Sequence, residues 1–144
     1  MSNTWKKSIT QLNELQRNFI ETVNALQKSK REKPGVCGTW SPRQVVAHMT
    51  GWEIETILQF ERIERGTSAL EHDIDLFNEK SVQQREHLYW DETLIELKEA
   101  QKKFNQKALS ISFDDDSIDE GYWELINVQI EHYLHHIRQL KKWI

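Results

Sequence analysis

The sequence predicts an all-α protein, a bundle of four long helices with one additional short helix. Apolar residues recur at three- and four-residue spacing over most of the chain, which is the pattern of amphipathic helices. Only five Gly and two Pro occur among 144 residues, too few turn-formers for a many-stranded β architecture. Helix start and stop signals divide the chain into five segments. At this length we expect a single domain over residues 1–144.

The first predicted helix covers about residues 4–29. Trp5, Phe19 and Leu26 belong to its apolar stripe. The basic run KSKREK, residues 28–33, falls at its end and is interpreted as the C-terminal turn. Cations suit that position because the helix dipole is negative there. A Pro-Gly pair follows and stops the helix.

The second predicted helix has a strong start signal. Ser41 is a good N-cap, Pro42 suits the first helical position, and the side chain of Gln44 can complete a capping box. The apolar periodicity then continues to about Arg65. Gly66 follows and is expected to end the helix, because glycine readily adopts the backbone conformation that closes a helix.

Three further helices follow at about residues 74–88, 90–111 and 120–143, the first of them short, and Asp91 lies near the cap of the second. An acidic loop, residues 113–121, joins the last two. Its carboxylates suit the positive N-terminal end of the final helix. A cation site built from Asp114, Asp115 and Asp116 is the weaker alternative, because the alternating-ligand spacing of a calcium loop is absent.

Composition and charge limit the partners that we expect. The net charge of −4 gives no broad basic field, so no nucleic acid is predicted among the partners. The sequence has no run of about eighteen apolar residues, so no membrane span is predicted. The lone Cys37 excludes an intramolecular disulfide and fits a reducing cytoplasm, which is the predicted location. Cys37 itself is interpreted as an inert thiol.

The final helix contains HYLHH, three histidines in five residues. At about 100° per residue, with Tyr122 at zero, His136 falls at about −40° and His132 at about −80°, on one edge of the apolar arc. Gln129 lies next to His136 on this edge, at about −20°. His135 lands at about −140°, among charged residues, and is predicted to face solvent. His132 and His136 therefore form an (i, i+4) pair at the edge of the bundle.

The second helix carries one histidine on a comparable edge. His48 lies at about −60° on its wheel, one turn from Trp52, and could meet the histidine pair if the two helices are neighbours. The pattern alone leaves open a metal site or a partly buried group without metal. Glu55 shares that side, about 10 Å further along the axis, and is interpreted as a surface acid. His72 and His87 are also predicted to lie on the surface.

Three segments carry a resemblance to a known family. GTWSPRQVVAHMTGWE (38–53), IDLFNEK (74–80) and EHYLHHIRQLKKWI (131–144) together resemble the DinB-like, or YfiT-like, superfamily of metalloenzymes. Within it the chain is most similar to the ClbS/DfsB-type four-helix-bundle branch. The resemblance implies an up-down-down-up bundle, a homodimer and one divalent transition metal, nickel or zinc, held by three histidines.

The family's ligand positions match His48, His132 and His136 in this chain. The main functional hypothesis is thus a divalent-metal-dependent enzyme that hydrolyses a small electrophilic molecule or transfers a thiol to it. Trp52, Gln129 and Tyr133 are the predicted substrate contacts, and no catalytic residue is assigned. The alternative is a non-catalytic, protective bundle of the ClbS type that binds a small molecule. A purely structural dimerisation bundle is the third and weakest hypothesis.

Overall fold

The computed structural model describes residues 3–67, 70–111 and 120–144. The elements there are α1 (Asn3–Asn24), the short 3-10 helix η1 (Lys28–Lys30), α2 (Pro42–Glu64), α3 (Ile74–Gln83), α4 (Trp90–Ser110) and α5 (Glu120–Lys141). The prediction of four long helices and a short one is confirmed. The aspartates 114–116, weighed above as a cation site, lie outside the described residues. Within the described part, no helix is long and apolar enough to cross a membrane.

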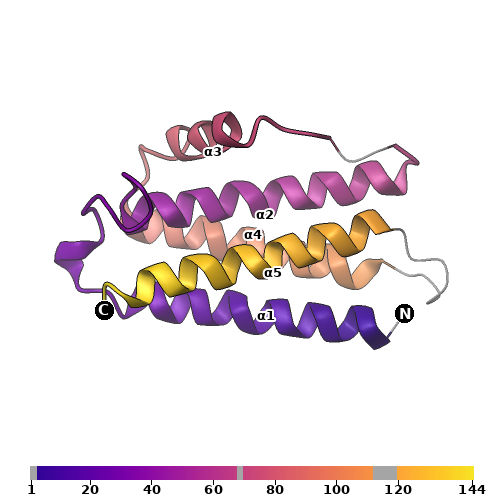
Figure 1. Ribbon diagram of the computed structural model, residues 1–144, viewed down its shortest axis with the longest axis horizontal. Helices are drawn as coiled ribbons and strands as arrows, with labels where there is room; N and C mark the ends of the chain where they lie inside the picture. The colour runs from indigo at the N-terminus through magenta and orange to yellow at the C-terminus, as the bar shows by residue number, and fades with distance from the viewer. Residues whose placement is uncertain (1–2, 68–69, 112–119) are drawn as a thin grey trace.

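The four long helices form an up-down-down-up bundle (Figure 1). Helices α2 and α4 run in the same direction because the connection between them returns along the outside of α2 and carries α3. Helix α1 packs closely on α5, and α2 packs closely on α4, whereas the α1–α4 and α2–α5 pairs make fewer contacts. The bundle therefore has two loosely packed gaps, between α1 and α4 and between α2 and α5.

The core is built from the apolar stripes that the sequence predicts. Trp5 and Phe19 of α1 are fully buried, as are Phe60 of α2 and Phe104 of α4. The indole N–H of Trp5 donates to the backbone oxygen of Ala108, at 3.1 Å, and so ties the start of α1 to the end of α4. Each buried aromatic side chain of this kind contributes about 1.5–3 kcal/mol by leaving water.

The predicted capping box at the start of α2 is confirmed. The backbone N–H of Gln44 donates to Ser41 Oγ at 3.3 Å, and the Ser41 N–H donates to Gln44 Oε1 at 2.9 Å. Pro42 is the first helical residue, and Gly66, with a φ of +76°, follows the end. This cap sets the helical phase of the first half of α2, where His48 lies.

Two predicted helices end earlier in the structure. Helix α1 stops at Asn24 rather than about residue 29, because the backbone N–H of Leu26 bonds to Val23 three residues back, a tighter turn. Leu26 is still buried, so the apolar spacing continues past the helix. The basic run 28–33 thus lies in η1 and the following turn, not in the last turn of α1. Helix α3 ends at Gln83, short of the predicted residue 88.

Candidate functional site

Three histidines from two helices meet in the gap between α2 and α5. Nε2 of His48 lies 2.7 Å from Nε2 of His132, which lies 3.0 Å from Nε2 of His136. The ligand atoms of all three residues lie within 4.8 Å of one another. Such a convergence of ring nitrogens is the donor arrangement that holds a divalent transition metal.

Burial keeps the three imidazoles neutral. Burial lowers the pKa of His48 to about 2, and the neighbouring His132 and His136 lower it further. Burial lowers the pKa of His132 to about 3, and His136 adds to this shift. Burial lowers the pKa of His136 to about 4, although a hydrogen bond from its ring to Gln139 acts in the opposite direction. A neutral imidazole carries the lone pair that a ligand nitrogen needs.

Neighbouring side chains orient these rings. Nδ1 of His136 donates to Gln139 Oε1 at 2.7 Å, which leaves the lone pair on Nε2, directed into the cluster. The indole of Trp40 lies 4.8 Å from the ring of His48, and the indole of Trp52 lies 6.5 Å from that of His132. Nδ1 of His48 is buried and has no hydrogen-bond partner among the described residues.

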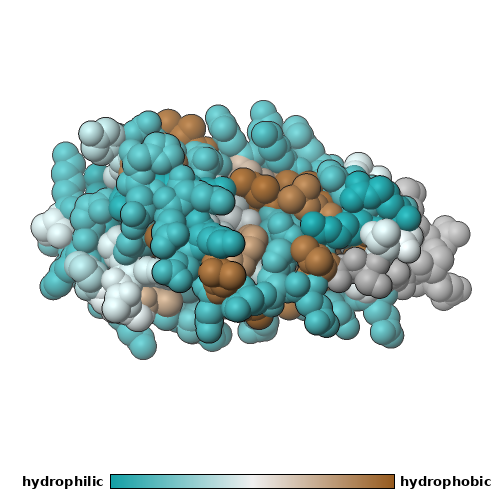
Figure 2. All heavy atoms as spheres, turned by 90° about the horizontal axis from the view of Figure 1, so that it is seen from above, coloured by the Kyte–Doolittle hydropathy of each residue, from teal (hydrophilic) through white to brown (hydrophobic). Residues whose placement is uncertain are grey.

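The histidines line a pocket of about 1020 Å³ between α2, α5 and the segment before α3. Five of the six histidines of the chain line it, together with Trp40 and Trp52. Leu70, Ile74 and Val128 also line it and are exposed, so they form an apolar rim. Figure 2 shows hydrophobic side chains gathered on the upper face, which carries α3, among hydrophilic ones. The pocket therefore combines an apolar rim with a polar, nitrogen-rich floor.

The three predicted substrate contacts have different positions. Trp52 lines the pocket, and its Nε1 donates to Asn78 Oδ1 at 2.6 Å. Gln129 also lines the pocket, although its buried side chain donates to Glu53 Oε1 at 3.1 Å. Tyr133 is fully buried in the core, where its hydroxyl donates to Glu53 Oε1 at 2.7 Å. Tyr133 therefore does not line the pocket, but it packs in the core and hydrogen-bonds to Glu53.

Glu53 is the centre of a buried polar layer that crosses the bundle. Its carboxylate accepts hydrogen bonds from Tyr133 and Gln129 of α5 and from Gln16 Nε2 of α1 at 3.5 Å. Gln101 of α4 donates to the Tyr133 hydroxyl at 3.1 Å, so all four long helices take part. Burial raises the pKa of Glu53 to about 7, although the hydrogen bonds from Tyr133 and Gln16 oppose this shift.

Sequence reasoning missed both buried carboxylates of α2. Glu53 follows Met49 by four residues and precedes Phe60 by seven, so helical spacing already places it inward. The prediction that Glu55 is a surface acid is wrong, because Glu55 is only 7% exposed. Its Oε1 accepts from His72 Nε2 at 2.8 Å. That partner comes from the segment before α3, which folds back over α2.

The other histidines fall into two groups. His135 and His87 are exposed, as predicted. His72 is half-buried, so the prediction that it lies on the surface is wrong. Its ring lies 4.7 Å from that of Phe77 and 6.1 Å from that of Trp52. The contact with Glu55 explains this position, because a carboxylate buried beside the ring holds it against the pocket wall.

No family model matches the chain, and no curated protein matches it. Among solved structures, the colibactin self-resistance protein ClbS in complex with a double-stranded DNA matches with a TM-score of 0.79 and 14% identity. The match covers 96% of this chain and 94% of that chain. The protein therefore has a ClbS-like all-helical fold.

This comparison overturns two predictions. A divalent-metal-dependent enzyme was the main functional hypothesis, but the matching structure is a self-resistance protein bound to DNA. Three convergent histidines serve binding as well as catalysis, so their pattern did not decide between the two. The prediction of no nucleic acid among the partners is contradicted by the same structure. A net charge sums over the whole chain and does not report a local basic surface.

Proposed function

We propose that the protein is a protective binding protein, whose histidine pocket holds a small molecule. The observation that carries this proposal is the pocket itself, about 1020 Å³ and lined by two tryptophans and five histidines. A cavity of this size lies at about the upper limit of the range of about 300–1,000 Å³ that is usual for small-molecule sites. The shared fold with a self-resistance protein supports a protective role.

The lining indicates the chemistry of the ligand. Indole rings and the apolar rim favour a molecule with aromatic or aliphatic surface. The neutral imidazoles of His48, His132 and His136 offer lone pairs, and therefore suit a metal ion or a hydrogen-bond donor on the ligand. The ligand class is thus a largely apolar small molecule with a polar group that reaches the floor of the pocket.

A divalent transition metal, nickel or zinc, is part of this proposal. His48, His132 and His136 would hold it, since their three Nε2 atoms converge and their lowered pKa values keep them unprotonated. Such an ion would supply an open coordination position for a heteroatom of the ligand. Gln139 would fix the orientation of the His136 ring, because it accepts the hydrogen bond from Nδ1 of that ring.

Metal analysis of protein without a polyhistidine tag tests this part. We expect stoichiometric nickel or zinc in the wild type and in His135→Ala, the matched control on the exposed side of α5. We expect no bound metal in the double variant His132→Ala/His136→Ala. Full occupancy in that double variant would refute the assignment of the metal site.

Ligand binding is tested with 8-anilinonaphthalene-1-sulfonate, a fluorescent aromatic anion. We expect saturable binding to the wild type and binding weakened by roughly tenfold in Trp52→Leu, because one stacking indole is lost. Trp123→Leu is the control, since Trp123 packs on Trp5 at 5.4 Å and does not line the pocket. Equal affinity in Trp52→Leu and wild type would count against the pocket as the binding site.

A second candidate function is binding of double-stranded DNA, favoured by a basic end of the bundle. The basic end consists of Lys28, Lys30, Arg31 and Lys33 around η1 and of Arg138, Lys141 and Lys142 at the end of α5. Nζ of Lys30 donates to the backbone oxygen of Trp143 at 2.6 Å, and Nζ of Lys33 lies 5.7 Å from the Trp143 ring. These contacts hold the two segments together.

This basic end is strongly unbalanced in charge. Glu32 is the one carboxylate within the two segments, and it pairs with Arg43 at 2.6 Å. The chain as a whole carries −4, so the acidic excess lies elsewhere. Clustered lysine and arginine neutralise phosphates, whatever the net charge of the protein. The double-stranded DNA bound by ClbS supports this partner.

Fluorescence anisotropy with a labelled 20-base-pair duplex tests DNA binding. We expect the affinity of the wild type to fall steeply with salt. For each phosphate contact, the logarithm of the association constant should fall by about 0.9 when the salt concentration rises tenfold. Lys28→Glu/Lys141→Glu should abolish binding, whereas Lys6→Glu/Lys7→Glu, the same charge change on exposed residues of α1, should have little effect. Equal losses in both double variants would show that only net charge matters.

Membership of the DinB-like superfamily, a homodimer and a cytoplasmic location stay predictions. A homodimer would agree with the exposed apolar rim of the pocket, formed by Leu70, Ile74 and Val128. Sedimentation equilibrium of the purified protein tests the homodimer. A monomer at all concentrations would refute it.

A further inference from the structure

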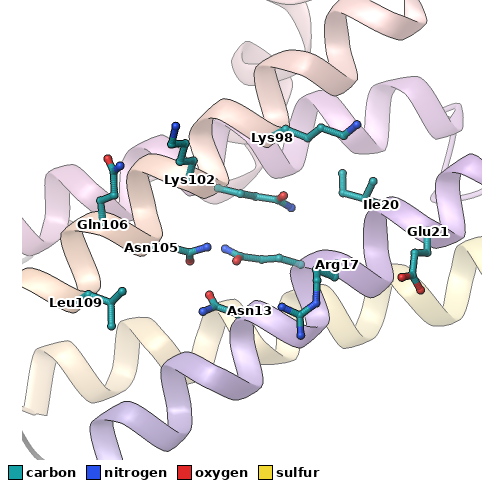
Figure 3. A pocket seen from close by; sticks show the side chains of 11 residues that line it. Asn13, Arg17, Ile20, Glu21, Lys98, Lys102, Asn105, Gln106 and Leu109 are labelled. Atoms are coloured by element: carbon teal, nitrogen blue, oxygen red, sulfur yellow. The ribbon is translucent and has the colours of Figure 1, made fainter.

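The gap between α1 and α4 contains a second cavity, of about 550 Å³ (Figure 3). It occupies the loosely packed gap that does not contain the histidines, and it shares no lining residue with the histidine pocket. Most of the described residues that line it carry polar or charged side chains, although the aliphatic stems of these side chains make much of its surface apolar, and none of these residues is aromatic. The two cavities therefore differ in chemistry as well as in position.

Four carboxamides form the centre of this cavity. Asn13 and Gln16 come from α1, and Gln101 and Asn105 come from α4. Asn13 and Asn105 point toward one another across the gap (Figure 3). Among the described residues, neither the Oδ1 atom of Asn13 nor that of Asn105 has a hydrogen-bond partner, although both atoms are buried. Buried acceptors of this kind reduce stability unless a donor reaches them.

The inner pair of carboxamides is fixed by the core. Nε2 of Gln16 donates to Glu53 Oε2 at 3.5 Å, and Nε2 of Gln101 donates to the Tyr133 hydroxyl at 3.1 Å. Gln16 is 3% and Gln101 8% exposed, so both belong to the buried polar layer. The core therefore fixes the inner pair in place beneath the cavity.

The rim of the cavity is positively charged. Arg17, Lys98 and Lys102 line it and are exposed, against a single carboxylate, Glu21. None of the ion pairs between described residues uses these three cations. A ligand that enters the cavity thus meets positive charge at the rim and unpartnered acceptors further in.

We propose that this cavity, the α1/α4 site, binds a short acidic peptide segment. The carboxylates of the peptide pair with Arg17, Lys98 and Lys102, which are exposed at the rim. Its backbone N–H groups donate to the Oδ1 atoms of Asn13 and Asn105 once these two side chains rotate and open their buried oxygens to the cavity. The wall lacks an aromatic platform among the described residues, which disfavours a nucleobase or a sugar ring. The proposal is independent of the ligand of the histidine pocket.

Proton–nitrogen NMR tests the α1/α4 site with an N-acetylated tetrapeptide of alternating aspartate and glycine. We expect saturable shifts of the side-chain amide signals of Asn13 and Asn105, and little response to the same peptide with asparagine in place of aspartate. Asn13→Leu/Asn105→Leu should weaken binding by roughly tenfold or more. The unfolding midpoint of this double variant should be unchanged or raised, because two unpartnered buried acceptors are removed.

Matched controls separate the site from general effects. Lys98→Ala/Lys102→Ala should weaken binding of the acidic peptide, whereas Lys103→Ala and Asn18→Leu should not, because these exposed neighbours do not line the cavity. Equal weakening in the control variants would overturn the proposal, as would absence of saturable shifts. The proposal also fails if acetate alone reproduces the shifts at the same concentrations, or if a DNA duplex shifts the same amides in place of the peptide.

Discussion

The buried carboxyl group of Glu53 makes the stability of the bundle depend on pH. In Glu53→Gln the side chain keeps an oxygen that accepts from the Tyr133 hydroxyl, but it cannot ionise. The ordinary pKa of the group is 4.5, and burial raises it to about 7 in the folded protein. Between pH 4.5 and about pH 7 the Glu53 carboxyl has lost its proton in the unfolded chain but still holds it in the folded chain. Stability therefore falls as pH rises through this window and levels off above it.

The size of this effect follows from the two pKa values. At about 1.4 kcal/mol per pH unit, ionising Glu53 lowers the free energy of unfolding by about 3 kcal/mol once the pH exceeds 7. The histidine cluster acts in the opposite direction. The lowered pKa values of His48, His132 and His136 cause a loss of stability as pH falls below 6.5. The difference between variant and wild type isolates Glu53, because the histidines contribute equally to both.

Urea unfolding of both proteins at pH 5 and pH 8 measures this difference. We expect the free energy of unfolding of Glu53→Gln, relative to wild type, to rise by about 2–3 kcal/mol from pH 5 to pH 8. Glu14→Gln, at an exposed position of α1, is the control and should show no such rise. A difference between Glu53→Gln and wild type that is the same at both pH values would refute the reasoning.

Three further changes test the packing of the bundle by urea unfolding. Gly51→Ala should lower stability by about 1–3 kcal/mol, because a Cβ there would lie 2.6 Å from Ser81 Cβ, and Gly51→Ala/Ser81→Gly should regain part of the loss. No loss in Gly51→Ala would contradict the close contact of α2 and α3. Ser41→Ala should cost about 1 kcal/mol through loss of the N-cap of α2, and a neutral effect would contradict that cap. Phe104→Ala should cost about 3–5 kcal/mol, since the side chain is fully buried, and a cost below 1 kcal/mol would contradict that burial.

Local sequence signals were sufficient to predict which segments are helical. The capping residues Ser41 and Gln44 located the start of α2, and the periodic apolar residues of α1 matched its buried stripe. The errors fell at helix ends. Leu26 kept the apolar spacing although the backbone had already tightened into a 3-10 turn, so the periodicity overran the helix.

Helical phase also located part of the site. It separated His132 and His136 from the exposed His135, because residues four apart share a face and their neighbour one position away does not. Helical phase alone did not predict that His48 lies beside them, because which helices are neighbours depends on the whole topology. The resemblance supplied that partner, and the geometry then brought the three ring nitrogens together.

The sequence by itself determined the five helices, their inward faces and the edges on which the histidines lie, because these depend on residues within a few turns of one another. Only the tertiary structure decided which edges meet. It buried Glu53 and Glu55 beneath distant partners, joined η1 to the end of α5 in one basic end, and opened two chemically different cavities in the loosely packed gaps. Charge and burial at these places depend on contacts between residues far apart in the chain. Neither the net charge nor the helical wheel of one segment predicts such contacts.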